Sequence, residues 1–289
     1  MNRREFLAVA AALGLAAGVP APAAAAPFEP TRFSVEVRGT GPDVVLIPGL
    51  TAGRDVWRGT VAAVPGYRYH LVQVSGFAGE PARGNAEGAV VAPLADEIVR
   101  YIADRRLERP AIVGHSMGGT VAMMIGARHP QLAGRIMVVD MLPQPAGLFG
   151  GTAEDLGPFA NTLRNAMSSR SGRRLFGSLM TAFSPPDTSN ARSDPDVVAR
   201  AMHELAGIDL TPQLARIRAP LTIVYAAPDA RARAAIERQF AAAYAGARGA
   251  RLLRIDDSGH MVMLDQPARF RTALREFLGR GFRAPGAGQ

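Results

Sequence analysis

Residues 111–119 read Ala-Ile-Val-Gly-His-Ser-Met-Gly-Gly, and an apolar segment of helical composition follows them. The first three residues are typical of a short buried strand, so a Gly-x-Ser-x-Gly pattern centred on Ser116 falls where a strand turns into a helix. Such a turn leaves no room for side chains beside the serine, which accounts for Gly114 and Gly118. We therefore predict that Ser116 is a nucleophile held above the end of a sheet, rather than part of an ordinary glycine-rich turn.

A serine nucleophile needs a base to accept its proton, and His260 is the candidate. The sequence Ser-Gly-His-Met at residues 258–261 follows a predicted strand and precedes the last predicted helix. His260 therefore lies on a loop at the carboxyl end of a strand, where α/β sheets gather their active sites.

An acid must hold this histidine in the right tautomer, and two aspartates compete for the role. Asp229 and Asp140 each follow a predicted strand, so either loop can reach a histidine at the same edge of the sheet. Aspartate is also common as a helix cap or turn residue, and this is the expected role of whichever one is not the acid. We favour Asp229. With either residue the chain order is serine, acid, histidine.

The tetrahedral intermediate of acyl transfer needs two preorganised N–H donors for its oxyanion. Met117 supplies the donor that follows the nucleophile. The second donor is predicted within Pro48-Gly49-Leu50, directly after the strand predicted at residues 44–47. Proline has no N–H and Gly49 permits a tight turn, so Leu50 is the predicted donor.

Short β-branched runs alternate with longer helical segments along most of the chain, which is typical of a mostly parallel sheet covered by helices. Strands are predicted at residues 32–37, 44–47, 70–74, 111–113, 135–139, 221–225 and 251–255. Helices are predicted at residues 55–64, 91–105, 117–128, 231–244 and 267–280. The connection from Asp140 to Leu221 is too long for a structureless loop. We expect a cap domain in it, with short helices at residues 161–167, 174–182 and 196–205.

The first residues resemble a twin-arginine export signal. Residues 2–7 read Asn-Arg-Arg-Glu-Phe-Leu, a weakly apolar stretch follows at 8–19, and small residues at 21–26 fit the pockets of a signal peptidase. The apolar stretch is shorter than the roughly 20 residues that a bilayer span requires, so cleavage is favoured over a membrane anchor. We predict a signal peptide at 1–26, passage through the twin-arginine translocase, and a periplasmic or secreted protein with no stable membrane span.

The length of 289 residues, with 48% hydrophobic residues, suits one α/β domain with an insertion. After the signal peptide, the predicted parts are a first part of the core at 27–140, a cap insertion at 141–211 and a second part of the core at 212–289. The chain contains no cysteine, which excludes disulfides, a thiol nucleophile and thiolate metal ligands. The five histidines form no pair at i, i+4 spacing, so no metal site is expected.

The net charge of +8 reflects 33 basic and 25 acidic residues that are spread along the chain. Arginine runs at 170–174 and 231–238 carry no interleaved aromatic residues and match no recognised nucleic-acid module. We therefore interpret them as solvated surface and expect no binding to nucleic acid.

Four motifs together resemble the α/β-hydrolase superfamily, and the similarity covers residues 31–280. They lie at residues 46–49, 114–119, 219–229 and 259–261. The resemblance implies an α/β fold with an eight-stranded, mostly parallel sheet and an inserted helical cap. It also implies a triad of Ser116, Asp229 and His260, and hydrolysis through an acyl-enzyme without a cofactor. The chain departs from the family pattern in the oxyanion loop, where Pro48-Gly49 replaces the usual His-Gly.

The leading hypothesis is a hydrolase of carboxylic esters with small or medium apolar acyl groups. Apolar side chains of the predicted cap are candidates for an acyl pocket, although their helical spacing favours packing for most of them. They are Met141, Leu142, Phe149, Phe159, Met167, Phe176, Met180 and Phe183. The same triad also serves perhydrolysis, acyl transfer, amide cleavage and carbon–carbon bond hydrolysis. A non-catalytic binding module is the alternative from another class, but a binder has no need of a triad.

Overall fold

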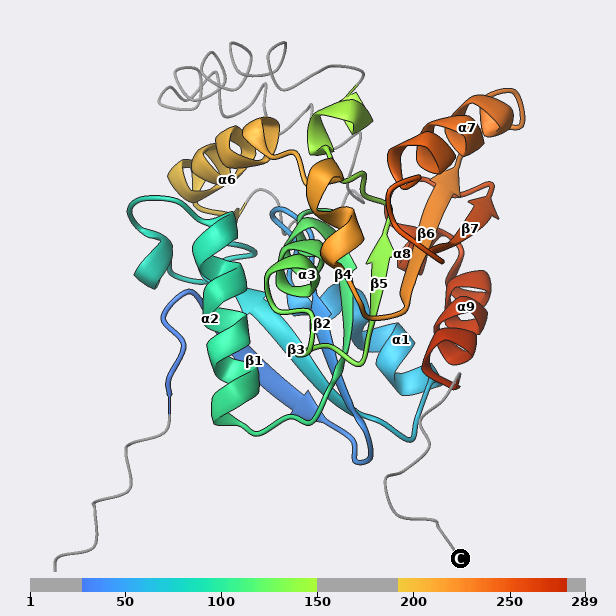
Figure 1. The fold of residues 1–289 in the computed structure, drawn as a ribbon. Coiled ribbons are helices and arrows are strands. Elements are labelled where there is room, and N and C mark those ends of the chain that lie inside the picture. Colours follow the sequence, from blue (N-terminus) through green and yellow to red (C-terminus); the bar gives the residue numbers. More distant parts are fainter. Residues whose placement is uncertain (1–27, 150–191, 280–289) are drawn as a thin grey trace, which may run out of the picture.

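A computed structural model describes residues 28–149 and 192–279 of the protein, in which seven strands form one sheet (Figure 1). The strand order is β1-β3-β2-β4-β5-β6-β7, and β1 alone runs antiparallel to its neighbour β3. The strands are β1 (Phe33–Arg38), β2 (Asp43–Ile47), β3 (Arg68–Val74), β4 (Ala111–His115), β5 (Arg135–Val139), β6 (Leu221–Ala227) and β7 (Arg251–Asp256). Each of the seven predicted strands is confirmed, with ends that differ by at most two residues.

Helices connect these strands and cover both faces of the sheet. They are η1 (Arg54–Trp57), α1 (Arg58–Ala63), η2 (Arg83–Asn85), α2 (Val91–Asp104), α3 (Met117–Arg128), η3 (Pro145–Phe149), α6 (Pro195–Gly207), η5 (Thr211–Arg216), α7 (Arg233–Ala243), α8 (Val262–Asp265) and α9 (Pro267–Gly279). The helix predicted at 55–64 is divided between η1 and α1, and the one predicted at 196–205 is α6. The helices predicted at 161–167 and 174–182 lie outside the described residues.

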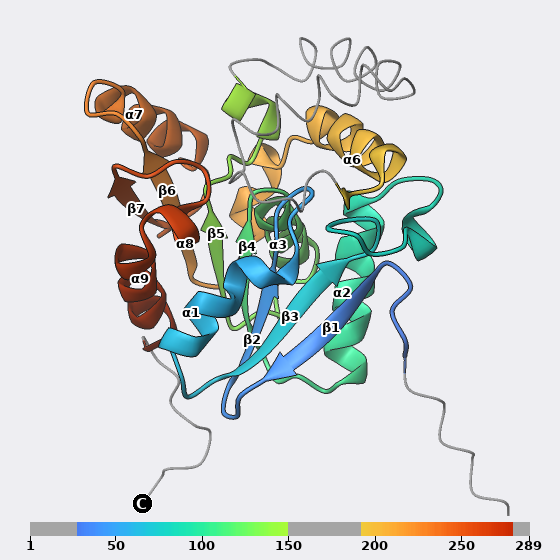
Figure 2. The same cartoon turned by 180° about the vertical axis from the view of Figure 1, so that it is seen from behind.

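Two hydrophobic clusters hold the layers together. Helices α2 and α3 lie on one face of the sheet, and α1 and α9 lie on the other (Figures 1 and 2). Alternate residues of β2 divide between the clusters, because successive side chains of a strand point to opposite faces. Val45 and Ile47 join the first cluster, and Val44 and Leu46 join the second.

Trp57, the only tryptophan of the chain, is fully buried against Phe270 in the second cluster, with ring centroids 6.2 Å apart. Two candidates for an acyl pocket can also be compared with this core. Met141 and Leu142 belong to the first cluster and pack in the core. The side chains of the other acyl-pocket candidates lie outside the described residues.

The expectation of eight strands is wrong for the described part of the chain, which forms seven. Residues 28–32, which precede β1, lie along α2 instead of adding a strand. Thr31 donates to Glu97 through its hydroxyl at 2.6 Å and through its N–H at 3.0 Å, and Phe28 N–H donates to Asp104 at 3.0 Å. These bonds hold the segment to α2, and β1 forms the edge of the sheet.

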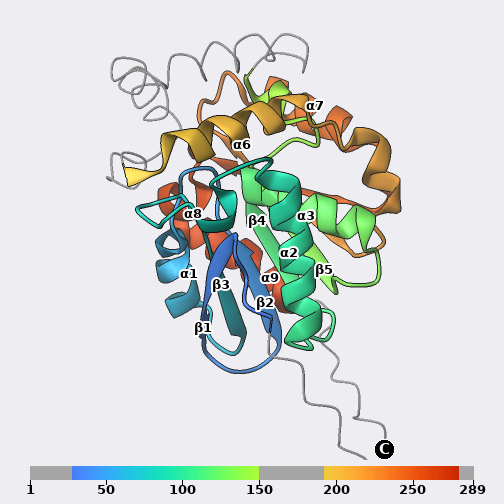
Figure 3. The ribbon, with the colours of Figure 1, turned by 90° about the vertical axis from the view of Figure 1, so that its left-hand side faces the viewer.

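Helix α6 lies across the carboxyl end of the parallel strands (Figure 3). The Glu204 carboxylate accepts three backbone N–H bonds at the start of α2, from Val90, Val91 and Ala92, at 2.7 to 2.8 Å. A carboxylate at this end also interacts favourably with the helix dipole. Helix α6 is therefore fixed to the core by α2. Among the helices within 28–149 and 192–279, none is long and apolar enough to cross a bilayer.

Candidate active site

Ser116 occupies the sharp turn between β4 and α3 that the sequence predicts. Its backbone has φ 53° and ψ −123°, a strained conformation for a residue with a side chain. A Cβ at Gly114 would lie 2.0 Å from Gly118 O, and one at Gly118 would lie 2.3 Å from Ile47 O. Both glycines are therefore required for the close approach of the chain, as predicted. Ser116 is half-buried, so its side chain is accessible at the end of β4.

Beside this turn, His260 forms a hydrogen-bonded pair with Asp140. His260 Nδ1 lies 2.7 Å from Asp140 Oδ2, and the two side chains are 19% and 10% exposed. The other carboxylate oxygen accepts the N–H of Ala226 at 2.8 Å. With both oxygens engaged, the carboxylate has a fixed orientation toward the imidazole.

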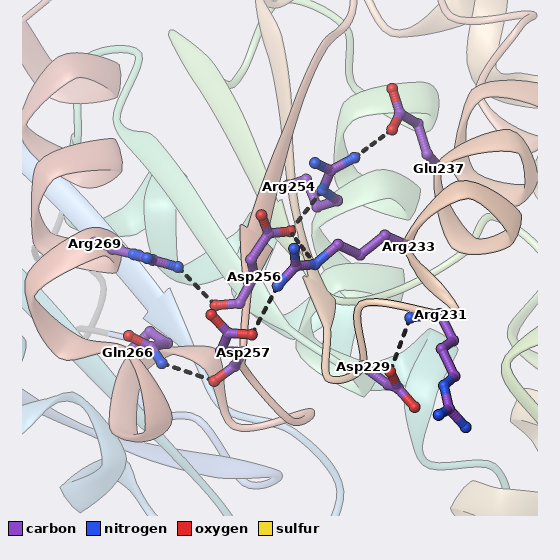
Figure 4. Close-up of polar contacts among 9 residues, drawn as sticks. All are labelled: Asp229, Arg231, Arg233, Glu237, Arg254, Asp256, Asp257, Gln266 and Arg269. Carbon is purple, nitrogen blue, oxygen red and sulfur yellow. Dashed lines mark hydrogen bonds and ion pairs between the residues drawn. The ribbon is translucent and has the colours of Figure 1, made fainter.

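The preference for Asp229 as the partner of His260 is corrected by this geometry. Asp229 is exposed, and its Oδ1 accepts the N–H of Arg231 at 2.8 Å in a local turn (Figure 4). This is the turn role that the sequence left open for the aspartate that is not the acid. Asp140 instead follows β5 directly, and its positive φ of 50° turns the chain where it meets His260.

His115 also contacts the base loop, although the sequence argument gave it no role. Its Nε2 lies 2.9 Å from His260 O, so Nε2 carries the proton and donates it to the carbonyl. Full burial lowers the pKa of His115 to about 3, and the charge of His260 contributes in the same direction to a smaller extent. The ring is therefore neutral. Its Nδ1 is buried without a hydrogen-bond partner, 2.9 Å from where a Cβ on Gly49 would lie.

The loop that carries His260 is fixed where it leaves β7 by a group of polar contacts (Figure 4). Asp257 has a positive φ of 59°, and its carboxylate accepts a bond from Arg233 at 2.8 Å. Its carbonyl accepts from Gln266 at 2.7 Å, and the carbonyl of Asp256 accepts from Arg269 at 2.8 Å. These contacts connect the end of β7 to α7 and α9, which limits the movement of the His260 loop.

Asp265 holds the other side of this loop. A Cβ at Gly259 would lie 3.0 Å from Asp265 Oδ2, so the carboxylate packs against the backbone next to His260. Burial raises the pKa of Asp265, while the N–H groups of Gly259 and Met261 and the charge of His260 act in the opposite direction. Asp265 belongs to no motif that would predict this contact from the sequence.

The predicted oxyanion loop packs directly on the nucleophile. A Cβ at Gly49 would lie 3.0 Å from the Ser116 Cβ, so only glycine fits at this contact. Within the described residues, neither the Leu50 N–H nor the Met117 N–H donates a hydrogen bond to another group. The assignment of these two groups as oxyanion donors stays a prediction. The same part of the chain holds no group of three or more acidic or histidine side chains fit to bind a metal ion.

Comparison with known proteins agrees with the fold. Residues 44–273 match the sequence profile of the alpha/beta hydrolase family. The chain belongs to this family. It is an enzyme, a hydrolase with the alpha/beta hydrolase fold.

Two curated relatives within the alpha/beta hydrolase family carry the same name, pimeloyl-[acyl-carrier protein] methyl ester esterase. The one from Aeromonas hydrophila is 35% identical over 111 residues, which are 38% of this chain and 42% of the relative's length. The one from Aromatoleum aromaticum is 27% identical over 245 residues, 78% of this chain and 94% of the relative.

Solved structures of the family share its fold with this chain. The enol-lactonase from Burkholderia xenovorans superposes with a TM-score of 0.69 at 19% identity, over 86% of this chain and 96% of that one. At this identity the likeness shows the fold alone.

Proposed function

We propose that this protein is an exported serine hydrolase that cleaves carboxylic esters with small or medium apolar acyl groups through an acyl-enzyme. The observation that carries the proposal is the strained Ser116 turn beside the Asp140–His260 pair. The activities for which the two methyl ester esterases and the enol-lactonase are named support ester chemistry for this member of the family.

In the proposed acylation step, His260 is the base. Its Nδ1–H donates to Asp140 at 2.7 Å, which leaves Nε2 as the basic nitrogen. Nε2 accepts the proton of Ser116 as the serine oxygen attacks the ester carbonyl. The negative charge that develops on the carbonyl oxygen is stabilised by the N–H groups of Leu50 and Met117, and Asp140 stabilises the imidazolium.

The remaining steps follow from the same groups. The imidazolium returns its proton to the departing alcohol, and the acyl group stays on Ser116. Water then attacks the acyl-enzyme, with His260 again as the base, and releases the carboxylic acid. No other residue needs to supply a proton, and neutral His115 next to Ser116 keeps a second positive charge away from the imidazolium.

The test is to incubate the purified protein with a fluorophosphonate probe and with p-nitrophenyl esters of increasing acyl length. Ser116→Ala is expected to abolish labelling and to lower turnover by about 10⁶-fold, as loss of a serine nucleophile does in comparable enzymes. Ser75→Ala is the matched control, because Ser75 is a buried serine at the end of β3, at the same edge of the sheet. Its labelling and turnover are expected to match the wild type.

Two outcomes would change the proposal. A folded wild type that neither binds the probe nor turns over any ester would support the non-catalytic binding module. A wild type that is labelled but slow on all esters would direct attention to perhydrolysis, acyl transfer, amide cleavage or carbon–carbon bond hydrolysis. Identification of the products from each substrate class distinguishes these reactions.

We propose in addition that residues 1–26 direct export through the twin-arginine translocase and are removed. The support is the Arg3-Arg4 pair followed by an apolar stretch and small residues. Replacing both arginines with lysine is expected to keep the protein in the cytoplasmic fraction, whereas the wild type reaches the periplasm or the medium. Mass spectrometry of the exported protein tests removal near Pro27. An unchanged distribution of the lysine variant would contradict the route.

A further inference from the structure

Ser193 precedes α6, and its hydroxyl connects two loops near Ser116. It accepts the N–H of Ala78 at 3.0 Å and donates to the carbonyl of Thr51 at 3.3 Å. Ala78 belongs to the loop after β3, and Thr51 follows Leu50 in the loop after β2. The start of α6 is thus bonded to the loop that carries the proposed oxyanion donor.

The loop after β2 contains a tight turn from Gly49 to Ala52. The N–H of Ala52 donates to Gly49 O at 3.2 Å, and Thr51, the third residue of the turn, has φ 63°. A positive φ at the third residue alone is the feature of a type II turn, where glycine or asparagine is usual. Thr51 is β-branched and buried, so its backbone is strained and depends on its surroundings to keep this conformation.

The turn sets the direction in which the Leu50 N–H points. In a trans peptide the C=O and N–H point in opposite directions, and Gly49 O points to Ala52. The Leu50 N–H of the same peptide therefore points out of the turn. If Thr51 left its positive φ by opening the turn, the bond from Ala52 N–H to Gly49 O that fixes this peptide would break, and the Leu50 N–H would change direction.

Two hydrogen bonds oppose that relaxation. Thr51 Oγ1 donates to Leu50 O at 2.6 Å, and Ser193 Oγ holds Thr51 O. Ser193 is itself held in place, because the N–H of the next residue, Asp194, donates to Gly76 O at 2.7 Å. Gly76 in turn packs against α6, since a Cβ on it would lie 2.8 Å from Val197.

From these contacts we infer that Ser193 is a positioning residue for the oxyanion hole. It keeps Thr51 in its strained conformation, and through this turn it aims the Leu50 N–H at the substrate oxygen. The inference rests on the proposed function, because it assumes that Leu50 stabilises an oxyanion. It also means that α6, which Glu204 attaches to α2, supports the catalytic loop from outside the sheet.

The first experiment measures ester hydrolysis by Ser193→Ala. Removal of one oxyanion donor lowers kcat by about 10² to 10³, and a donor that is present but poorly aimed should lose less, about tenfold. KM should change little, because the interaction forms in the transition state. Ser193→Thr keeps a hydroxyl at this position and is expected to recover most of kcat. If Ser193 had a purely structural role, Ser193→Ala would lower the urea midpoint and leave kcat per folded molecule unchanged.

A second experiment removes the strain instead of the bond. Glycine adopts a positive φ without strain, so in a Thr51→Gly background the Ser193→Ala change should lower kcat by less than about threefold. Hydrogen exchange of the Ala52 amide gives a readout that is independent of activity. Ser193→Ala should speed this exchange, and the effect should be smaller in the Thr51→Gly background.

The outcomes separate this inference from the proposed function. An active wild type whose kcat and Ala52 exchange do not respond to Ser193→Ala would overturn the role of Ser193 alone. Faster exchange with unchanged kcat would also overturn it, because the turn would then move without affecting catalysis. A folded wild type that is inactive and unlabelled by the fluorophosphonate probe would overturn the proposed function itself, before any variant is compared.

Discussion

Two aspartate–histidine pairs lie at opposite ends of the sheet and have nearly the same distance between carboxylate and imidazole. Asp140 follows the carboxyl end of β5 and lies 2.7 Å from His260. Asp43 begins β2, at the amino end of the sheet, and its Oδ1 lies 2.8 Å from His70 Nε2. The distance between carboxylate and imidazole therefore does not distinguish a catalytic pair from a structural one.

The surroundings of the second pair make it a structural element. His70 Nδ1 lies 2.8 Å from the hydroxyl of buried Tyr101 on α2, so both of its nitrogens are engaged. Burial lowers the pKa of His70 and raises that of Tyr101, which keeps both groups neutral. Burial would also raise the pKa of Asp43, but hydrogen bonds from Arg68 and His70 outweigh it and the pKa is lowered. The result is an ion pair and two hydrogen bonds that tie α2 to β2 and β3.

A cavity beside the Asp43–His70 pair does not make this pair an active site. A cavity of about 500 Å³ lies against His70 and Tyr101, at the amino end of the sheet. A raised pKa makes the tyrosine a poor nucleophile, and no strained turn presents its hydroxyl. At the carboxyl end, Ser116 has the strained turn, and Gly49 packs against it. The two pairs thus differ in the group beside the histidine, which is a strained serine turn in one and a buried tyrosine in the other. They also differ in the end of the sheet at which they lie.

The largest effect expected from this comparison is on activity. Asp140→Asn should lower kcat for p-nitrophenyl esters by about 10⁴-fold, because an amide does not hold His260 in the reactive tautomer. Asp229→Asn is the control that tests the correction of the acid, and it should change kcat by less than about twofold, since this exposed aspartate only closes a local turn. A large loss in the Asp229 variant and none in the Asp140 variant would reverse the assignment.

The next effect concerns stability and belongs to the second pair. Asp43→Ala should lower the free energy of unfolding by about 2 to 3 kcal/mol, because it leaves His70 and Arg68 without their acceptor. Urea denaturation measures this, and kcat per folded molecule should stay at the wild-type value. Asp96→Ala is a suitable control, because Asp96 forms an exposed ion pair with Arg128 worth at most about 1 kcal/mol. If Asp43→Ala lowers kcat at full folding, the pair has a role in catalysis.

The sequence predicted the fold well because local patterns carry it. The strands are recognisable from short β-branched runs, and the serine turn is recognisable because Gly114 and Gly118 flank Ser116 in a short motif, although the contact that requires Gly118 comes from Ile47. The expected eight strands exceed the seven of the described residues, because the prediction came from the family and not from residues 28–32. Their bonds to α2 depend on Glu97, which is distant in sequence.

Site residues that have a local motif were predictable from the sequence. The acid was ambiguous, because its identity depends on contacts between segments that are distant in the chain. Ser116 and His260 have local motifs, whereas Asp140 and Asp229 both follow strands and differ only in which loop meets His260. Neither His115 nor Ser193 has a motif that predicts its contact, because each reaches a segment far away in the chain. A histidine directly before a predicted nucleophile is the one signal that could have directed attention to His115.

The last prediction uses pH, because burial of a neutral histidine is expected to make stability depend on pH. Burial lowers the pKa of His115 from 6.5 to about 3, so as the pH falls below 6.5 the unfolded chain takes up the proton first. Burial of the neutral ring contributes in full to the free energy of unfolding above pH 6.5. Toward pH 3 this contribution is lost, at up to about 1.4 kcal/mol per pH unit. His115→Gln should remove this part of the slope in urea denaturation between pH 6.5 and 4, whereas His129→Gln, which changes an exposed histidine, should leave the slope unchanged. If the wild type and both variants give parallel curves, His115 is not the buried neutral group that this geometry requires.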